Sequence, residues 1–269
     1  MLKNRLIPVI VVKGNLIVQS FSFNRYLPIG NLKTAIDFFV NWDVDEIIIV
    51  DIDASKYKRT LSLDVIKSAS HECFVPLTIG GGISTIEDIK NILRAGADKI
   101  SINTAAIENP SFLKEAATRF GNQCMTVSVD AKKIDNEYYV FIKNGKVNTD
   151  IKVSDWIKKV ENLGAGEILI NSIDRDGSRK GYDIELLSLV SSSVNVPVIA
   201  CGGVGNMEHL VRGIKEGNCQ AVAAANIFQH TEHSTIAAKA MLSKSNLPIR
   251  LSSDVKYEDF EFDHMGRPV

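Results

Sequence analysis

The chain has 269 residues and a formal net charge of −1, and hydrophobic residues make up 45% of it. This length suits one barrel domain or two ordinary domains, and the composition is typical of a chain that buries a sizeable core. The near-neutral charge gives no electrostatic basis for binding nucleic acid or an anionic membrane. No small-residue cleavage site follows the N-terminal segment, and no apolar stretch approaches the roughly 20 residues that cross a bilayer. We therefore expect a cytoplasmic protein without membrane insertion or a nucleic-acid partner.

The four cysteines form no CxxC pair and have no metal-ligand spacing. Buried free thiols in a reducing compartment are the simplest interpretation of this pattern. The sequence therefore predicts no metal site and no cofactor.

Short β-branched runs alternate with longer segments of helical period along the chain. Strands are expected at 5–12, 46–51, 75–79, 99–102, 125–130, 167–172, 197–201 and 220–225. Helices are expected near 32–42, 59–71, 85–95, 110–119, 153–163, 183–193, 206–216 and 232–243. Eight nearly continuous apolar strands that alternate with eight helices predict an α/β fold, a single closed (β/α)₈ TIM barrel.

Local signals refine this prediction. The run Ser84-Thr85-Ile86-Glu87 predicts a capping box, and Asn109-Pro110 predicts an N-cap followed by proline at the first helical position. Residues 13–30 are expected to form a long first βα loop on the active face, and 133–147 a hairpin inserted after the fifth strand. The barrel is expected to span 1–251, with a peripheral C-terminal tail at 252–269.

The two halves of the chain repeat one another at one fixed offset. The run EIII at 46–49 recurs as EILI at 167–170, and the glycine pair at 81–82 recurs at 202–203. Agreement across several elements predicts two duplicated half-barrels, each of four βα units.

Each half ends its third strand in that glycine pair and its fourth strand in small polar residues, at 103–104 and at 226. Glycine lets backbone N–H groups approach an anion, and the N-terminus of the following helix adds a favourable dipole. The alternative is that the glycines only form tight βα turns. The duplication favours two phosphate sites across one barrel mouth.

Five segments carry a family resemblance: IPVIVVK near the start, IGGGI at 79–83, RAGADKISINTAA at 94–106, SVDAKK at 128–133 and GAGEILINSIDRDGSRKGYD at 164–183. They resemble the cyclase subunit of imidazole glycerol phosphate synthase over roughly residues 1–251. The resemblance implies a barrel that pairs with a class I glutaminase, whose ammonia crosses the barrel to a ribulose-type bis-phosphate substrate. The family closes an imidazole ring there and releases an aminoimidazole carboxamide ribotide.

The resemblance also implies residue roles. Asp130 matches one of the family's two essential aspartates. A pair of carboxylates suits ring closure, because protons must be both removed and delivered. The alternative for Asp130 is a capping role at the end of its strand. The residues expected to hold the two phosphates are Gly82, Asn103 and Thr104, and Gly177, Gly203 and Asn226, where the family usually has serine at the last position. The residues expected to gate ammonia entry at the opposite face are Arg5, Glu46, Lys99 and Glu167, for which ordinary ion pairs at strand starts are the alternative.

The substrate face departs from the family pattern. The family's other essential aspartate falls at Val11, which has no ionisable atom, and losing a positioned acid or base typically lowers a rate by about 10²–10⁴-fold. Gln19, Asn171 and Cys201 also replace the family's usual lysine, threonine and serine. The gate and the glycine turns keep the pattern, so the departures gather on the substrate face.

This asymmetry favours a barrel that still pairs with a glutaminase and conducts ammonia while its cyclase chemistry is impaired. Second copies of the cyclase subunit accompany surface-polysaccharide biosynthesis, where they are thought to supply ammonia to a sugar amidotransferase that makes acetamidino sugars. The leading hypothesis therefore names a glutaminase, a sugar amidotransferase and a phosphorylated small molecule as partners. The alternatives are an active cyclase of histidine biosynthesis, in which Asp51, Asp176 or a water replaces the missing group, an isomerase on the same barrel, and a binding scaffold. Val11 argues against both enzymes, and the intact gate argues against the scaffold.

Overall fold

The computed structural model describes residues 3–229, 234–253, 255–263, 266 and 268. Within these residues, eight parallel strands close a barrel in the order β10-β11-β12-β1-β4-β5-β6-β7, and β7 pairs back to β10. The barrel strands are β1 (Arg5–Lys13), β4 (Ile47–Asp51), β5 (Leu77–Gly80), β6 (Lys99–Ile102), β7 (Met125–Ile134), β10 (Glu167–Ser172), β11 (Val198–Cys201) and β12 (Ala221–Ala224). The predicted (β/α)₈ barrel is confirmed.

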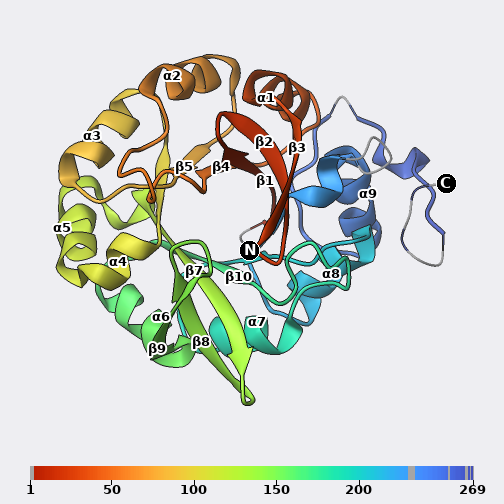
Figure 1. Cartoon of the computed structure of the whole chain (residues 1–269). Coiled ribbons are helices and arrows are strands. Elements are labelled where there is room, and N and C mark those ends of the chain that lie inside the picture. Colours follow the sequence, from red (N-terminus) through yellow and green to blue (C-terminus); the bar gives the residue numbers. More distant parts are fainter. Residues whose placement is uncertain (1–2, 230–233, 254, 264–265, 267, 269) are drawn as a thin grey trace.

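Helices form a ring around the strands, as Figure 1 shows in a view along the barrel. They are α1 (Leu32–Val40), α2 (Leu63–Glu72), α3 (Ile86–Arg94), α4 (Thr104–Glu108), α5 (Pro110–Phe120), α6 (Val153–Asn162), α7 (Ile184–Ser191), α8 (Met207–Lys215) and α9 (Thr235–Lys244). The helix expected from residue 59 begins only at Leu63, and residues 232–233 of the last expected helix lie outside the described residues. Every described helix is too short or too polar to cross a membrane.

The predicted capping box is displaced by one residue. Thr85 is the N-cap of α3, and its hydroxyl accepts the N–H of Asp88 while the carboxylate of Asp88 accepts the N–H of Thr85. The box is therefore Thr85–Asp88 rather than Ser84–Glu87, and the shorter Asp side chain closes it. Pro110 begins α5 as predicted, but the side chain of Asn109 accepts a hydrogen bond from Ser111 instead of capping the helix.

Two antiparallel extensions rise from the barrel. The expected loop at 13–30 is instead a hairpin of β2 (Leu16–Phe21) and β3 (Arg25–Gly30), which continues β1 through a turn with positive φ at Gly14 and Asn15. In Figure 1 this hairpin extends over the centre of the barrel. The insertion after the fifth barrel strand is confirmed: β7 pairs with β8 (Glu137–Ile142), and β8 with β9 (Val147–Lys152).

Apolar side chains pack in two layers. The larger cluster fills the space between the strands and the helices, and the smaller one fills the barrel interior. The interior cluster contains Ile7, Val9, Ile48, Leu169 and Ile199, with Val11 and Val50 packed against it. Residues along each strand alternate between the two clusters because successive strand side chains point to opposite faces.

The C-terminal segment packs beside α9, where Figure 1 shows it. Its short 3₁₀ helix η3 (Tyr257–Asp259) buries the ring of Tyr257, which is 6% exposed. The N–H of Met207 at the start of α8 donates to the carbonyl of Gly266. The segment therefore contacts the outer helices directly.

Candidate functional site

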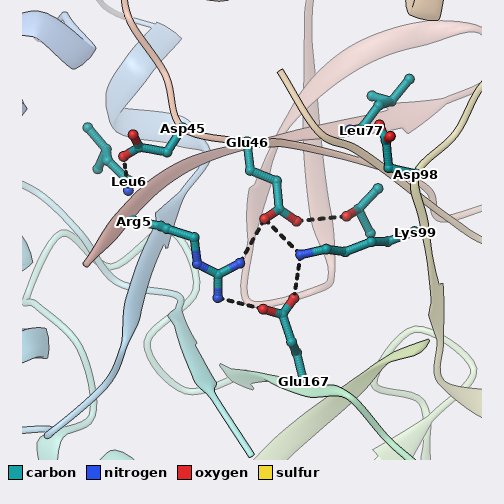
Figure 2. Close-up of polar contacts among 9 residues, drawn as sticks. Arg5, Leu6, Asp45, Glu46, Leu77, Asp98, Lys99 and Glu167 are labelled. Carbon is teal, nitrogen blue, oxygen red and sulfur yellow. Dashed lines mark hydrogen bonds and ion pairs between the residues drawn. The ribbon is translucent and has the colours of Figure 1, made fainter. Parts of the chain in front are cut away.

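Four charged side chains form a closed ring at the amino-terminal end of the barrel. Arg5 contacts Glu46 at 2.8 Å and Glu167 at 2.6 Å, and Lys99 contacts the same two carboxylates at 3.0 and 2.8 Å. Figure 2 shows positive and negative groups alternating around this charge ring. Arg5 and Lys99 are each 18% exposed, Glu167 11% and Glu46 2%. All four residues predicted as a gate therefore meet at one point.

Neighbouring groups hold the charges of the ring in place. Glu46 accepts a third hydrogen bond, from the hydroxyl of Thr78 at 2.8 Å, which satisfies its second oxygen. Burial opposes the charge on Arg5, but Glu167 and Glu46 outweigh it and raise the pKa of Arg5. Desolvated ion pairs are tolerated only with such complete hydrogen bonding.

The barrel interior above the ring has a polar side and an apolar side. The neighbours of Thr78, Ser101, Thr126 and Ser128 along β5, β6 and β7 belong to the outer cluster, so by strand alternation these four hydroxyls face the interior. We call them the hydroxyl row. The hydroxyl of Thr126 is buried without a hydrogen-bond partner among the described residues. The opposite side is formed by the apolar interior cluster.

Asp130 lies on β7 at the other end of this interior. Its carboxylate accepts a hydrogen bond from the side-chain amide of Asn103 at 2.7 Å, and the residue is 7% exposed. Burial, with a smaller contribution from the charge of Asp176, outweighs the opposing hydrogen bond from Asn103 and raises the pKa of Asp130 to about 7. A carboxyl group with this pKa can take up or release a proton near neutral pH.

We predict that Asp130 lowers stability as the pH rises. Its folded pKa lies above the ordinary value of 3.8, so its contribution is fully present below about pH 4 and is lost as the pH rises through about 7. Urea unfolding of Asp130→Asn and of the native chain should therefore diverge by roughly 2–3 kcal/mol in favour of the variant between pH 5 and pH 8. The control Asp64→Asn, whose side chain is 94% exposed, should show no such divergence. A pH-independent difference for Asp130→Asn would contradict the prediction.

Val11 lies on β1, which is diametrically opposite β7 in the ring of barrel strands. Val11 pairs in register with Val50 and packs against the interior cluster, so this side of the mouth carries an alkyl group. The carboxylate of Asp51, one of the groups considered as a replacement for an aspartate at position 11, already has two partners: Arg59 contacts one of its oxygens and the N–H of Asp53 donates to the other. A proton-transfer role for Asp51 stays a hypothesis.

A cavity of about 380 Å³ opens beside the ends of β11 and β12. Gly177, Gly203 and Asn226, the residues predicted to hold one phosphate, all line it. Among the lining residues, Arg179 carries the cationic side chain, a contribution that the sequence reasoning missed. Gly203 has a φ of +101°, and a Cβ there would lie 2.3 Å from the carbonyl oxygen of Gly181, so close backbone packing also requires this glycine.

Asn226 is engaged by the β2–β3 hairpin. Its amide donates to the carbonyl of Ser20 at 2.7 Å, and its oxygen accepts the N–H of Ser20 at 3.1 Å. Asp176 fastens the same hairpin through the Ser20 hydroxyl at 2.6 Å and the N–H of Phe23 at 3.1 Å. The hairpin therefore lies fixed against the cavity, a contact that no local sequence signal predicts.

The other predicted phosphate residues lie at the neighbouring turns after β5 and β6. Gly82 has a φ of +70°, and a Cβ there would lie 1.8 Å from the carbonyl oxygen of Arg59. Asn103 binds Asp130, and the hydroxyl of Thr104 accepts the N–H of Lys143 at 3.2 Å. Adjacent parallel strands thus bring these three residues to one side of the mouth.

The chain is thus a (β/α)₈-barrel protein with a cavity at the carboxyl ends of its strands and a charge ring at the opposite end. Residues 5–235 match the family model described as histidine biosynthesis protein, and the chain belongs to this family. It is 62% identical over 269 residues to a putative imidazole glycerol phosphate synthase subunit hisF2 of Vibrio vulnificus, covering 100% of this chain and 98% of that one. It is 42% identical over 252 residues to the imidazole glycerol phosphate synthase subunit HisF of Hydrogenobaculum sp., covering 93% of this chain and 100% of that one.

Proposed function

We propose that the chain is the barrel subunit of a cytoplasmic complex of the imidazole glycerol phosphate synthase type, in which a class I glutaminase supplies ammonia. The observation that carries the proposal is the charge ring, which covers one end of an interior that leads to Asp130 at the other end. The names of the two relatives support the same assignment.

Ammonia needs a path lined by groups that form hydrogen bonds with it but are too weakly acidic to convert it to ammonium. The hydroxyl row provides such groups along one wall, and the unpartnered hydroxyl of Thr126 is free to accept or donate a hydrogen bond to a small neutral guest. The apolar wall opposite disfavours ammonium, because an ion would lose its hydration there. In the proposed mechanism, opening of the ring admits ammonia, which then passes the hydroxyl row to the mouth.

At the mouth we propose that a phosphorylated ligand binds in the cavity beside Gly177 and Gly203, with Arg179 supplying positive charge. Val11 leaves Asp130 without a second acid–base group, so ring closure is impaired. The acceptor that the family resemblance implies for such a barrel is a sugar amidotransferase of surface-polysaccharide biosynthesis.

An active cyclase of histidine biosynthesis is the second candidate. It is favoured by Asp130, whose pKa of about 7 suits a group that both removes and delivers protons. In this case a water or the half-buried carboxyl of Asp176, which lines the cavity, provides the second proton transfer. Burial raises the pKa of Asp176, which favours its neutral, proton-donating form.

Steady-state turnover of the family's bis-phosphate substrate separates the two candidates. We expect no detectable turnover by the purified chain with saturating ammonium and no glutaminase. The 42% identical Hydrogenobaculum HisF is the positive control in the same assay. Turnover within about tenfold of that control would show that a second proton-transfer group is present and would favour the cyclase.

A further inference from the structure

Beside the charge ring, two reciprocal pairs of hydrogen bonds, which we call clamps, join the starts of neighbouring strands: β1 to β4 and β5 to β6. The N–H of Leu6 donates to the carboxylate of Asp45 at 2.8 Å, and the N–H of Asp45 donates back to the carbonyl of Leu6 at 3.2 Å. Leu77 and Asp98 make the same exchange at 2.8 and 2.9 Å. Figure 2 shows Asp45 beside Leu6 and Asp98 beside Leu77, on either side of Glu46.

Three of the four clamp residues, Leu6, Asp45 and Asp98, are sequence neighbours of charge-ring residues. Leu6 follows Arg5, and Asp45 precedes Glu46, so one clamp fixes the backbones that carry the first ion pair. Barrel hydrogen bonds between β1 and β4 begin only farther along, at Val9 and Ile48. Between Leu6 and Asp45 the two strands are therefore held by one backbone hydrogen bond and by the carboxylate of Asp45, in place of the regular ladder.

Asp45 is buried, and a cation from the outer helix layer compensates its charge. Lys239 of α9 donates to Asp45 at 3.0 Å and to Asp43 at 3.2 Å. The side chain of Lys239 is 1% exposed and that of Asp45 is 2% exposed. A carboxylate removed from water this completely needs such a partner to stay ionised.

The C-terminal segment completes this buried cluster. The hydroxyl of Tyr257 donates to Asp43, on the oxygen that also contacts Lys239. The same hydroxyl accepts the N–H of Ser252 at 3.1 Å, which ties it to its own segment. A continuous line of bonded groups thus runs from η3 through Asp43, Lys239 and Asp45 to the clamp beside Arg5.

We infer that Asp45 is a positioning residue of the charge ring, and that Lys239 and Tyr257 hold it in place. The C-terminal segment, which is far from the ring in sequence, is therefore part of the structure that sets the geometry of the barrel's amino-terminal opening. The consequence for ammonia entry rests on the proposed function, whereas the consequence for ring geometry does not.

The geometric arm of the test is nitrogen NMR of the Arg5 guanidinium, assigned with Arg5→Lys. Its two terminal nitrogens contact different carboxylates, so the native chain should give two separate signals. Asp45→Asn keeps an acceptor for Leu6 but loses the charge pair with Lys239, and the two signals should merge through faster rotation. If the single variant folds poorly, the double variant Asp45→Asn/Lys239→Gln, which removes both charges together, is measured instead. The two Arg5 signals should merge in it as well. Two signals that stay separate in the double variant would overturn the inference.

Tyr257→Phe tests the contribution of the C-terminal segment, since it removes one hydroxyl and leaves the ring. The matched control is Tyr182→Phe, which loses a buried hydroxyl bonded to the carbonyl of Ala223, away from the charge ring. We expect faster exchange of the Arg5 signals in Tyr257→Phe and unchanged exchange in Tyr182→Phe. Equal behaviour of the two variants would overturn the role assigned to the segment.

The functional arm measures ammonia that escapes into bulk solution when the complex with its glutaminase hydrolyses glutamine. Lys99→Met breaks the charge ring directly, so the ammonia that escapes from this variant gives the value expected when the ring no longer functions. Escape should rise in Asp45→Asn by about tenfold, since misplacement of a group by about 1 Å can change a rate by up to ~10²-fold. No rise in Lys99→Met would count against the proposed function alone, and a rise in Lys99→Met without one in Asp45→Asn would count against the positioning role alone.

Discussion

Val11→Asp should create turnover of the bis-phosphate substrate where the native chain shows none. The substitution places a carboxyl group on β1 across the mouth from Asp130, on the partly exposed side of the interior cluster where water can solvate it. A second positioned acid–base group typically contributes about 10²–10⁴-fold, so we expect turnover at least about 10²-fold above that of the native chain. The measurement is steady-state turnover with saturating ammonium.

Two variants separate proton transfer from a general effect of polarity. Val11→Asn has nearly the same shape as Val11→Asp but no proton to transfer at neutral pH, and it should show no gain. Val50→Asp places a carboxyl on the neighbouring strand at the position paired with Val11, and it should also stay inactive. A gain in either control equal to that of Val11→Asp would contradict the role given to position 11.

Glu46→Ala should lower the free energy of unfolding more than any surface charge variant. Glu46 is 2% exposed and accepts hydrogen bonds from Arg5, Lys99 and Thr78, so its removal leaves the two cations with only one shared carboxylate, that of Glu167. Breaking a buried pair in this way typically lowers stability by about 3–5 kcal/mol. Urea unfolding monitored by circular dichroism gives the value.

The control is Glu185→Ala, which removes the partner of Lys133 at a position where the glutamate is 66% exposed. Exposed pairs contribute about 0–1 kcal/mol, so this variant should unfold nearly as the native chain does. Equal losses in the two variants would mean that the charge ring is no better shielded from water than an ordinary surface pair.

The barrel was predictable because its strands are buried on both faces, which leaves unbroken apolar runs in the sequence. Convergence of the site residues followed from the same fold, since parallel strands bring their ends together. The β2–β3 hairpin was missed because β3 carries Pro28 and several exposed residues, and because the turn between the strands has non-glycine residues, Ser22 and Phe23, at positive φ. Such a segment becomes a hairpin through the contacts of Ser20 with Asp176 and Asn226, which lie 156 and 206 residues farther along the chain.

Pairings between charges were harder to predict than their positions. The sequence places Asp51 at a strand end, where a catalytic role is plausible, but its partner Arg59 comes from an irregular turn with no periodicity to reveal it. Lys239 lies in a helix whose pattern gives no sign that an ammonium group is buried. The partner of Asp51 depends on the path of the segment after β4, and the partner of Asp45 on how α9 packs, and both are properties of the assembled barrel.

The closure of the barrel between β12 and β1 also constrains how the chain folds. Because the first strand completes its pairing only with residues 221–224, the N-terminal half keeps an unpaired strand edge until nearly the whole barrel has been synthesised. Such long-range pairing slows folding and exposes edges to aggregation. Arg5 contacts Glu46 in its own half and Glu167 in the other, so the charge ring is completed only when the two halves join. An intact ring is therefore a marker that the two halves of the barrel have joined, and it should not form in an isolated N-terminal half.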